Sequence, residues 1–131
     1  DIDIIYADRL NKKTAKIYAS SLSPTLYWTY SKELIGAIGA FPSEDNRYEI
    51  GYNISKKHWR NGYTTEALKA VIKFLKEEAK VYKVICAHIS TNLASGKVMQ
   101  KAGMEYDGTL KDYRIDKSTN ERVDLIYYSS R

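Results

Sequence analysis

The sequence has 131 residues, a length typical of one domain that buries its own hydrophobic core. Lys and Arg total 21 against 16 Asp and Glu, and the net charge of +5 fits nucleic acid, a phosphorylated cofactor, an acidic surface or no partner at all. No apolar run approaches the roughly 18 residues of a membrane helix, and the first residues lack a signal-peptide pattern. The lone Cys86 excludes a disulfide framework and suits a reducing cytosol. From the length and the cysteine content we expect a single cytoplasmic domain over residues 1–131.

The first half of the chain reads as a helix followed by strands. Residues 7–21 carry a weak helical pattern, and Pro24 blocks its continuation because its ring fixes φ and removes a donor. Three extended runs rich in strand-forming residues follow, separated by short polar segments: 25–30, 34–41 and 47–54. Their spacing predicts an antiparallel meander.

The second half alternates helices and strands. Apolar residues recur with helical spacing between Leu68 and Ala79, while lysines occupy the opposite face, which predicts an amphipathic helix. Residues 81–89 form a nearly continuous apolar strand, of the kind that is buried on both faces. A second helix is expected over 94–102, with Asn92 as its N-cap and Gly103 as its left-handed stop.

Two closing strands, at about 104–113 and 122–129, flank a polar turn. The predicted order is therefore helix, three strands, helix, strand, helix and two strands. This order predicts a mixed α/β (α+β) domain built around one central sheet.

The turn before the first long helix is unusual. An Asn-Gly pair normally makes a hairpin, yet Asn61 and Gly62 precede a helix. A helix N-terminus attracts anions, and glycine lets a phosphate approach the free N–H groups, with Arg60, Thr64 and Thr65 nearby as polar partners. An ordinary strand-to-helix connection explains the same glycine. Neither a mononucleotide-binding nor a dinucleotide-binding glycine motif is present.

Three motifs together resemble the GCN5-related N-acetyltransferase (GNAT) family. They are "EIGY" at 49–52, "WRNGYTTEA" at 59–67 and "NLASGKVMQKAGM" at 92–104. Their order and spacing are similar to the ribosomal-protein N-terminal acetyltransferase (Rim-type) branch, and the resemblance covers about residues 24–129. Trp59 departs from the wider family but is common in that branch, whereas Thr64 replaces the usual Gly or Ala.

The resemblance implies a central, mostly antiparallel sheet flanked by helices, with acetyl-CoA as cosubstrate. Its pyrophosphate would lie on backbone N–H groups from Arg60 to Thr65, including Asn61, Gly62 and Thr64. The pantetheine arm would run along Tyr52 to Ile54 like an added strand. Asn92 would bind the cofactor from the other side. Gly51 indicates a bulge where two strands separate to admit the cofactor.

Glu49 is the candidate base. Strand alternation places it on the face opposite Tyr48, Ile50 and Tyr52, on a central strand where a carboxylate is costly unless it is used or paired. The resemblance makes Glu49 a base that acts through water. A structural ion pair with Arg47 or Arg114 is an equal alternative.

Ser95 matches the serine that donates to the departing thiol in this branch. A local capping role for Ser95 is the alternative, and Tyr127 or Tyr128 on the last strand competes with it as the acid. The apolar neighbours of Cys86 place it in the core, and no covalent enzyme intermediate is required.

The two histidines have no ligand spacing around them, so we expect no metal site. We interpret His88 as a satisfied core residue, and His58 as a residue at the cofactor mouth.

The resemblance therefore implies an N-acetyltransferase that moves an acetyl group from acetyl-CoA to a primary amine by direct attack in a ternary complex. The amine is that of a small molecule or of a ribosomal or other protein N-terminus. A non-catalytic acyl-CoA-binding domain or a nucleic-acid-binding domain is the alternative. We expect a monomer or homodimer, without membrane or sequence-specific nucleic-acid contacts. From the resemblance we also expect the N-terminal strand and helix of the family to be missing or shortened in this chain.

Overall fold

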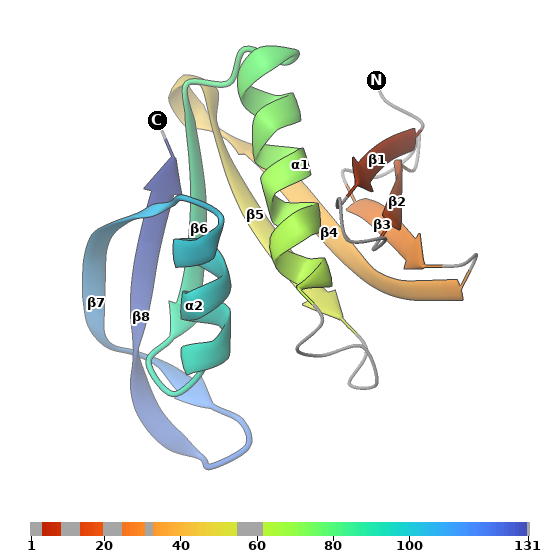
Figure 1. Ribbon diagram of the computed structural model, residues 1–131. Helices are drawn as coiled ribbons and strands as arrows, with labels where there is room; N and C mark the ends of the chain where they lie inside the picture. The colour runs from red at the N-terminus through yellow and green to blue at the C-terminus, as the bar shows by residue number, and fades with distance from the viewer. Residues whose placement is uncertain (1–3, 9–13, 20–24, 31–32, 55–61, 131) are drawn as a thin grey trace.

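The computed structural model describes residues 4–8, 14–19, 25–30, 33–54 and 62–130. Eight strands form one sheet in the order β1-β2-β3-β4-β5-β6-β8-β7, and two helices lie side by side on one face of it (Figure 1). The elements are β1 (Ile4–Asp8), β2 (Thr14–Ala19), β3 (Thr25–Tyr30), β4 (Glu33–Ser43), a 3-10 turn (Glu44–Asn46), β5 (Arg47–Ile54), α1 (Tyr63–Glu77), β6 (Lys83–Ile89), α2 (Leu93–Lys101), β7 (Glu105–Asp116) and β8 (Glu121–Ser130). The mixed α/β class is confirmed.

The helix predicted over 7–21 is wrong, because this region contributes two strands. β1 and β2 pair antiparallel, with Ile5 opposite Ile17 and Ala7 opposite Ala15. β-branched and aromatic residues supply much of both segments, and such side chains suit a pleated surface better than a helix. Two short strands thus precede the meander, and the described residues contain no α-helix ahead of α1.

The meander is confirmed, with β3, β4 and β5 paired antiparallel in chain order. α1 then crosses over to β6, which runs parallel to β5. This pairing joins only Arg47–Ile50 to Lys83–Cys86. Beyond it, β5 continues along β4 to Ile54 and β6 continues along β8 to Ile89. The two central strands therefore separate at Ile50 and open a gap between two halves of the sheet.

The bulge expected at Gly51 is wrong. β4 and β5 pair without a register shift, and Gly51 lies directly opposite Gly39. The strands separate because the β5–β6 ladder ends, and not because an extra residue is inserted in β5. Gly51 borders the gap, and a Cβ there would meet no atom within 4 Å.

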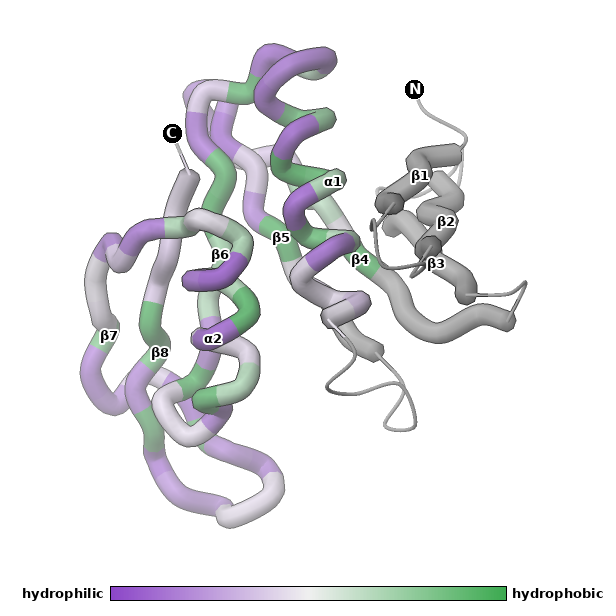
Figure 2. The backbone as a smooth tube through the Cα atoms, in the orientation of Figure 1, coloured by the Kyte–Doolittle hydropathy of each residue, from purple (hydrophilic) through white to green (hydrophobic). Residues whose placement is uncertain are grey.

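The core lies between the two helices and the face of the sheet that they cover. α1 buries its apolar stripe in a cluster with Ile50, Val84 and Cys86, and Met99 of α2 belongs to the same cluster. Figure 2 shows hydrophobic residues alternating with hydrophilic ones along α1, and hydrophobic segments on β5 and β6. Each buried Val, Leu, Ile or Met side chain of this core contributes about 1.5–3 kcal/mol relative to full exposure. The buried residues of the stripe are Ala67, Leu68, Val71, Ile72 and Leu75. The core position of Cys86 is confirmed.

The prediction that β6 is buried on both faces is wrong. Val84, Cys86 and His88 point toward the helices and are buried, while the alternate residues are only half-buried. The helices cover one face of this strand, and no other described helix covers the opposite face. No helix within the described ranges is both long and apolar enough to cross a membrane.

The second helix and its caps agree with the prediction. Asn92 is the N-cap of α2, and its side chain accepts a hydrogen bond from the Ser95 backbone N–H at 3.2 Å. Gly103 follows the helix with φ of 87°, a conformation that favours glycine. The closing hairpin of β7 and β8 is also confirmed.

Candidate active site

The gap between β5 and β6 leads into a cavity of about 340 Å³. Strand β5 contributes Glu49, Gly51 and Tyr52 to its wall. The end of β6 and the start of α2 contribute His88, Asn92 and Ser95, among others, and the closing hairpin adds Leu125 and Arg114. The separation of the two strands thus gathers side chains from five elements around one cleft.

Strand alternation divides the cleft into two sides. Tyr52 lies on the same face of β5 as core residue Ile50, so it points to the side that the helices cover. Glu49 lies on the other face, opposite Ile85 of β6. Register through β6 and β8 places Leu125 and Arg114 on that second face as well. The cleft therefore passes through the sheet and connects the helix side to the open side.

Tyr52 and Ser95 meet on the helix side. The Tyr52 hydroxyl lies 2.8 Å from Ser95 Oγ and 3.2 Å from the Ser95 carbonyl oxygen. Burial raises the pKa of Tyr52 to about 12, and the hydrogen bond with Ser95 only partly offsets this. The phenol is therefore protonated at neutral pH. Ser95 stands in the first turn of α2, where Asn92 caps its backbone N–H.

His88 is buried and hydrogen-bonded, as expected for a core histidine. Its Nδ1 lies 2.8 Å from the Ile89 carbonyl oxygen, and because a carbonyl can only accept, Nδ1 carries the proton. The ring stacks on Tyr128 with centroids 5.9 Å apart. On the other side it touches α2, where a Cβ on Gly96 would lie 2.7 Å from Nε2. Gly96 thus allows α2 to approach the ring.

A second hollow, of about 510 Å³, lies between the N-terminus of α1 and the side of α2. Gly62 is the N-cap of α1 with φ of 77° and makes no side-chain cap, so the first N–H groups face this hollow. Thr64 and Thr65 line it and are themselves buried. The prediction that a helix begins directly after Gly62 is confirmed.

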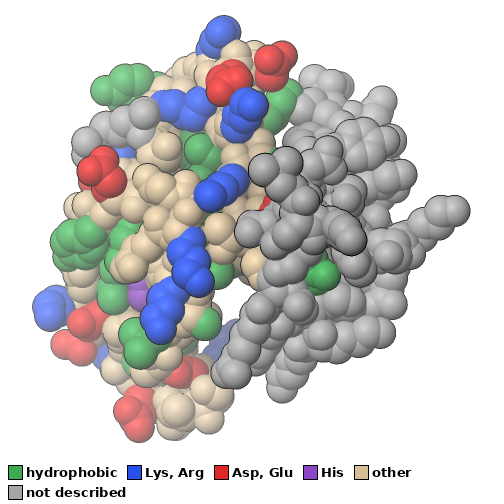
Figure 3. Space-filling view, in the orientation of Figure 1, with side chains coloured by type: hydrophobic (Ala, Val, Ile, Leu, Met, Phe, Trp, Pro, Cys, Tyr) green, Lys and Arg blue, Asp and Glu red, His purple; other side chains and the backbone are tan. Residues whose placement is uncertain are grey.

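Lys97 and Lys101 line the same hollow from α2, and the sequence analysis missed both. They stand one helical turn apart on one face of α2, and Figure 3 shows Lys and Arg side chains gathered over this helix. The i, i+4 spacing was a usable signal, but only the fold shows that this face turns toward the start of α1. Arg60, Asn61 and His58 lie outside the described residues. Ile54 ends β5, and only its backbone is described.

Glu49 is exposed in the cleft. In the described part of the chain no ion pair joins it to Arg47 or Arg114, and Arg47 instead donates from Nε to the Glu44 carbonyl oxygen at 2.8 Å.

Burial raises the pKa of Cys86 to about 12, with a further contribution from the charge of Glu49. Cys86 is therefore a neutral thiol at physiological pH.

Tyr127 and Tyr128 point to opposite faces of β8. Tyr128 packs under α2 and accepts a hydrogen bond from Gln100 Nε2 at 2.7 Å. Burial raises the pKa of Tyr127, Glu49 and Tyr113 raise it further, and Arg114 lowers it. Neither tyrosine is among the described residues that line the two hollows. No cluster of three or more metal-ligating side chains occurs among the described residues.

Comparison with known proteins agrees with this arrangement. A family model described as "Acetyltransferase (GNAT) domain" matches residues 6–105. The chain belongs to the GNAT acetyltransferase family. A GNAT-family acetyltransferase structure from Bacillus anthracis superposes with a TM-score of 0.75 at 27% identity, covering 85% of this chain and 68% of the other. The GNAT fold expected from the motifs is thereby confirmed.

Two curated relatives extend the comparison. "Uncharacterized N-acetyltransferase YoaA" of Bacillus subtilis is 33% identical over 91 residues, which are 68% of this chain and 51% of that protein. "[Ribosomal protein uS5]-alanine N-acetyltransferase" of Escherichia coli is 30% identical over 66 residues, which are 50% of this chain and 34% of that enzyme. This GNAT chain thus has Rim-type relatives, and it spans about half the length of the curated relatives it matches or less.

Proposed function

We propose that this chain is an acetyl-CoA-dependent N-acetyltransferase that transfers the acetyl group directly to a primary amine. The observation that carries the proposal is the separation of β5 and β6. It opens a cavity lined by Tyr52 and Ser95 on the helix side and by Glu49 on the open face, and a second hollow lies at the N-terminus of α1. Family membership agrees with this reading.

The phosphates of the cosubstrate fit the hollow at the start of α1. Backbone N–H groups from Gly62 to Thr65 donate to the pyrophosphate together with Arg60 and Asn61, and the Thr64 and Thr65 hydroxyls border the same space. Lys97 and Lys101 add two positive charges. We infer this role from the position of the two lysines beside the hollow, and no sequence motif indicates it.

The pantetheine arm fits the free edge of β5. Residues 51–54 pair with β4 on one side only, and their other edge faces the gap. An extended amide chain can hydrogen-bond to such an edge as an added strand, here along the backbone of Tyr52 to Ile54. Asn92 lines the same cavity on the side opposite β5. Its Oδ1 caps Ser95, which leaves its side-chain N–H groups available to the cosubstrate.

Glu49 takes the proton of the acceptor ammonium through a water molecule. An amine near pKa 8–10 is mostly protonated at neutral pH, so a carboxylate on the open face promotes the free base that attacks the acetyl carbonyl carbon. Glu49 has no ion-pair partner in the described part of the chain that would hold it out of this role.

Ser95 donates its hydroxyl proton to the departing sulfur as the carbon–sulfur bond breaks. The proton that the nitrogen loses on becoming the neutral amide returns to Ser95 through water. Either hydroxyl can donate in the Tyr52–Ser95 pair. In the proposed reaction the protonated phenol of Tyr52 donates to Ser95 Oγ, and the Ser95 O–H is then directed at the cleft. The buried neutral thiol of Cys86 takes no part, because a nucleophilic cysteine acts as thiolate.

For residues 1–131 we propose one cytoplasmic acetyltransferase domain, active as monomer or homodimer. A protein N-terminal α-amine is the acceptor class we propose, because a Rim-type relative carries that activity in its name.

Thermal unfolding with and without acetyl-CoA tests the cofactor site, and release of the CoA thiol with a panel of amines tests turnover. Acetyl-CoA at 100 times its dissociation constant should add about 2.7 kcal/mol to the free energy of unfolding. Gly62→Val should abolish this shift, while Lys69→Ala, on the exposed side of α1, should not. A shift without turnover on any amine would favour a non-catalytic acyl-CoA-binding domain, and no shift would contradict the proposal.

A further inference from the structure

Strand β7 contains a bulge next to the cleft. Leu110 pairs with Leu125, and the next pair is Arg114 with Val123, so β7 advances four residues while β8 advances two. Asp112 within the bulge has φ of 48°, a left-handed conformation that is rare for a residue other than glycine. Such bulges redirect side chains beside functional sites.

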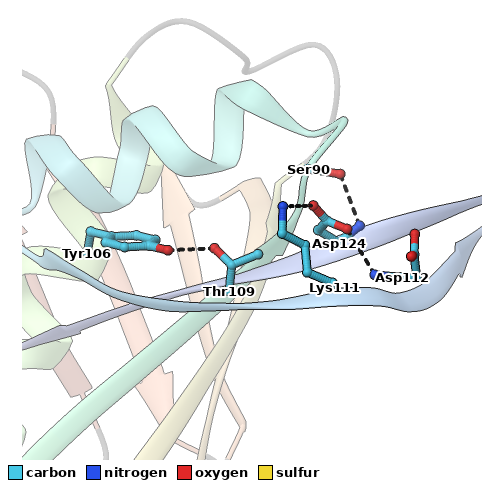
Figure 4. Close-up of polar contacts among 6 residues, drawn as sticks. All are labelled: Ser90, Tyr106, Thr109, Lys111, Asp112 and Asp124. Carbon is cyan, nitrogen blue, oxygen red and sulfur yellow. Dashed lines mark hydrogen bonds and ion pairs between the residues drawn. The ribbon is translucent and has the colours of Figure 1, made fainter.

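The bulge is held by polar contacts on both sides (Figure 4). The Asp112 backbone N–H donates to Asp124 Oδ1 at 2.9 Å, and the Lys111 Nζ lies 3.6 Å from Asp124 Oδ2. Asp124 is anchored in turn, because its backbone N–H donates to Ser90 Oγ at 3.2 Å. Arg122 Nη1 also donates to the Asp112 carbonyl oxygen at 3.2 Å.

The bulge changes the sign of the charge beside the cleft. A regular ladder continuing from Leu110 would place Asp112 opposite Val123. The two extra residues put Arg114 in that place, on the open face of the sheet. A guanidinium therefore lines the cavity where an uninterrupted strand would have presented a carboxylate.

Arg114 is exposed in the cleft, and no hydrogen bond or ion pair within the described ranges engages its guanidinium. Glu49 lines the same cavity and forms no ion pair with it. The charges of both groups act on the Tyr127 hydroxyl in opposite directions: Glu49 raises the pKa of Tyr127 and Arg114 lowers it. The open side of the cleft thus presents a carboxylate and a guanidinium that are not paired with each other.

We propose that Arg114 binds a carboxylate of the acceptor, so that the acceptor is an amine that also carries a carboxyl group. The inference rests on the proposed acetyl transfer. Glu49 attracts the ammonium end, and the planar guanidinium of Arg114 donates two N–H hydrogen bonds to the carboxylate as a bidentate pair. The same guanidinium repels polycationic amines and so selects against them.

The test compares acceptors that differ only in one charge. Alanyl-aspartate amide against alanyl-asparagine amide tests a side-chain carboxylate, and alanine against alaninamide tests an α-carboxylate. In at least one pair, kcat/KM of the native protein should favour the carboxylate member about tenfold or more. Arg114→Gln should bring that ratio close to one and leave the neutral member within about twofold. Arg114→Lys should retain part of the preference.

Lys117→Gln, in the turn of the same hairpin, is the matched control, since it removes the same charge from an exposed position. A preference that survives in Arg114→Gln, or no preference in either pair, overturns the inference. An intact acetyl-CoA thermal shift in Arg114→Gln shows that the fold and cofactor site persist.

Calorimetric titration of the four acceptors into the CoA-saturated protein separates this inference from the proposed activity. If acetyl transfer fails, tighter binding of a carboxylate member that is lost in Arg114→Gln still supports the anion subsite. Equal or absent binding within both pairs overturns it.

Discussion

The hydroxyl of Tyr52 on β5 lies 2.8 Å from Ser95 Oγ in the first turn of α2, across the mouth of the cleft. The two residues are 43 positions apart in the chain. The contact joins the strand proposed to bind the pantetheine arm to the residue proposed to protonate its sulfur.

Tyr52→Phe should lower kcat about tenfold, because Ser95 loses the hydrogen-bond partner that orients its hydroxyl. The KM for acetyl-CoA should change less than about twofold. In a double-mutant cycle, Tyr52→Phe should cost little in a Ser95→Ala background, since the two groups act together. Steady-state kinetics of the four proteins measures this coupling.

Tyr48→Phe is the control, because Tyr48 lies on the same strand and face without a hydrogen bond within the described residues. Fully additive effects of Tyr52→Phe and Ser95→Ala would show that the hydroxyl pair has no joint role in turnover.

Gly96→Ala should destabilise the protein by about 1–3 kcal/mol, although Ala normally favours a helix over Gly. The new Cβ would lie 2.7 Å from His88 Nε2, and the ring is held by the Ile89 carbonyl and Tyr128. Urea unfolding measures the loss. Gly108→Ala, where a Cβ meets no atom within 4 Å, is the comparison.

The same Gly96→Ala change in a His88→Ala background should be neutral or stabilising, because the obstructing ring is gone. An equal loss of stability in both backgrounds would mean that contact with His88 is not the reason for glycine at this position.

Lys97→Ala and Lys101→Ala should each weaken CoA binding about three- to tenfold, and the difference should shrink as ionic strength rises. Calorimetry with CoA and with acetyl-pantetheine, which lacks the phosphates, distinguishes their role. The lysine substitutions should weaken the binding of CoA and leave the binding of acetyl-pantetheine unchanged. Lys69→Ala and Lys73→Ala on the exposed side of α1 are matched controls. An equal loss for both ligands would argue against a phosphate contact.

Asp116→Asn should lower stability at neutral pH and have less effect in acid. Hydrogen bonds from the Ser118 hydroxyl, Thr91 and the Ser118 backbone hold the pKa of Asp116 below its usual value. A lowered folded pKa adds stability above the unfolded value of about 3.9, and this stability is lost as pH falls through the folded pKa.

Urea unfolding at pH 7 and near pH 3 measures that difference. Asp45→Asn, at an exposed position, should show no such pH-dependent difference. A constant gap between Asp116→Asn and the native protein across this range would contradict the linkage.

Much of the fold could be predicted from local signals. Asn92 and Gly103 mark the ends of α2 because capping and left-handed backbone depend on a few adjacent residues. Gly62 marks the start of α1 for the same reason. The helix prediction for residues 7–21 failed because the backbone groups of β1 and β2 pair with neighbouring strands. A weak helical spacing of apolar residues cannot outweigh strand pairing.

The helix caps, the core stripe of α1, the family and the residue types of the site could all be predicted from the sequence. The folded chain was needed to show that Tyr52 meets Ser95, that Lys97 and Lys101 face the start of α1, and that a bulge presents Arg114 in place of Asp112. This division arises because caps and amphipathic stripes depend on neighbours in the chain. Strand register and the point where two strands separate are set by contacts between distant residues.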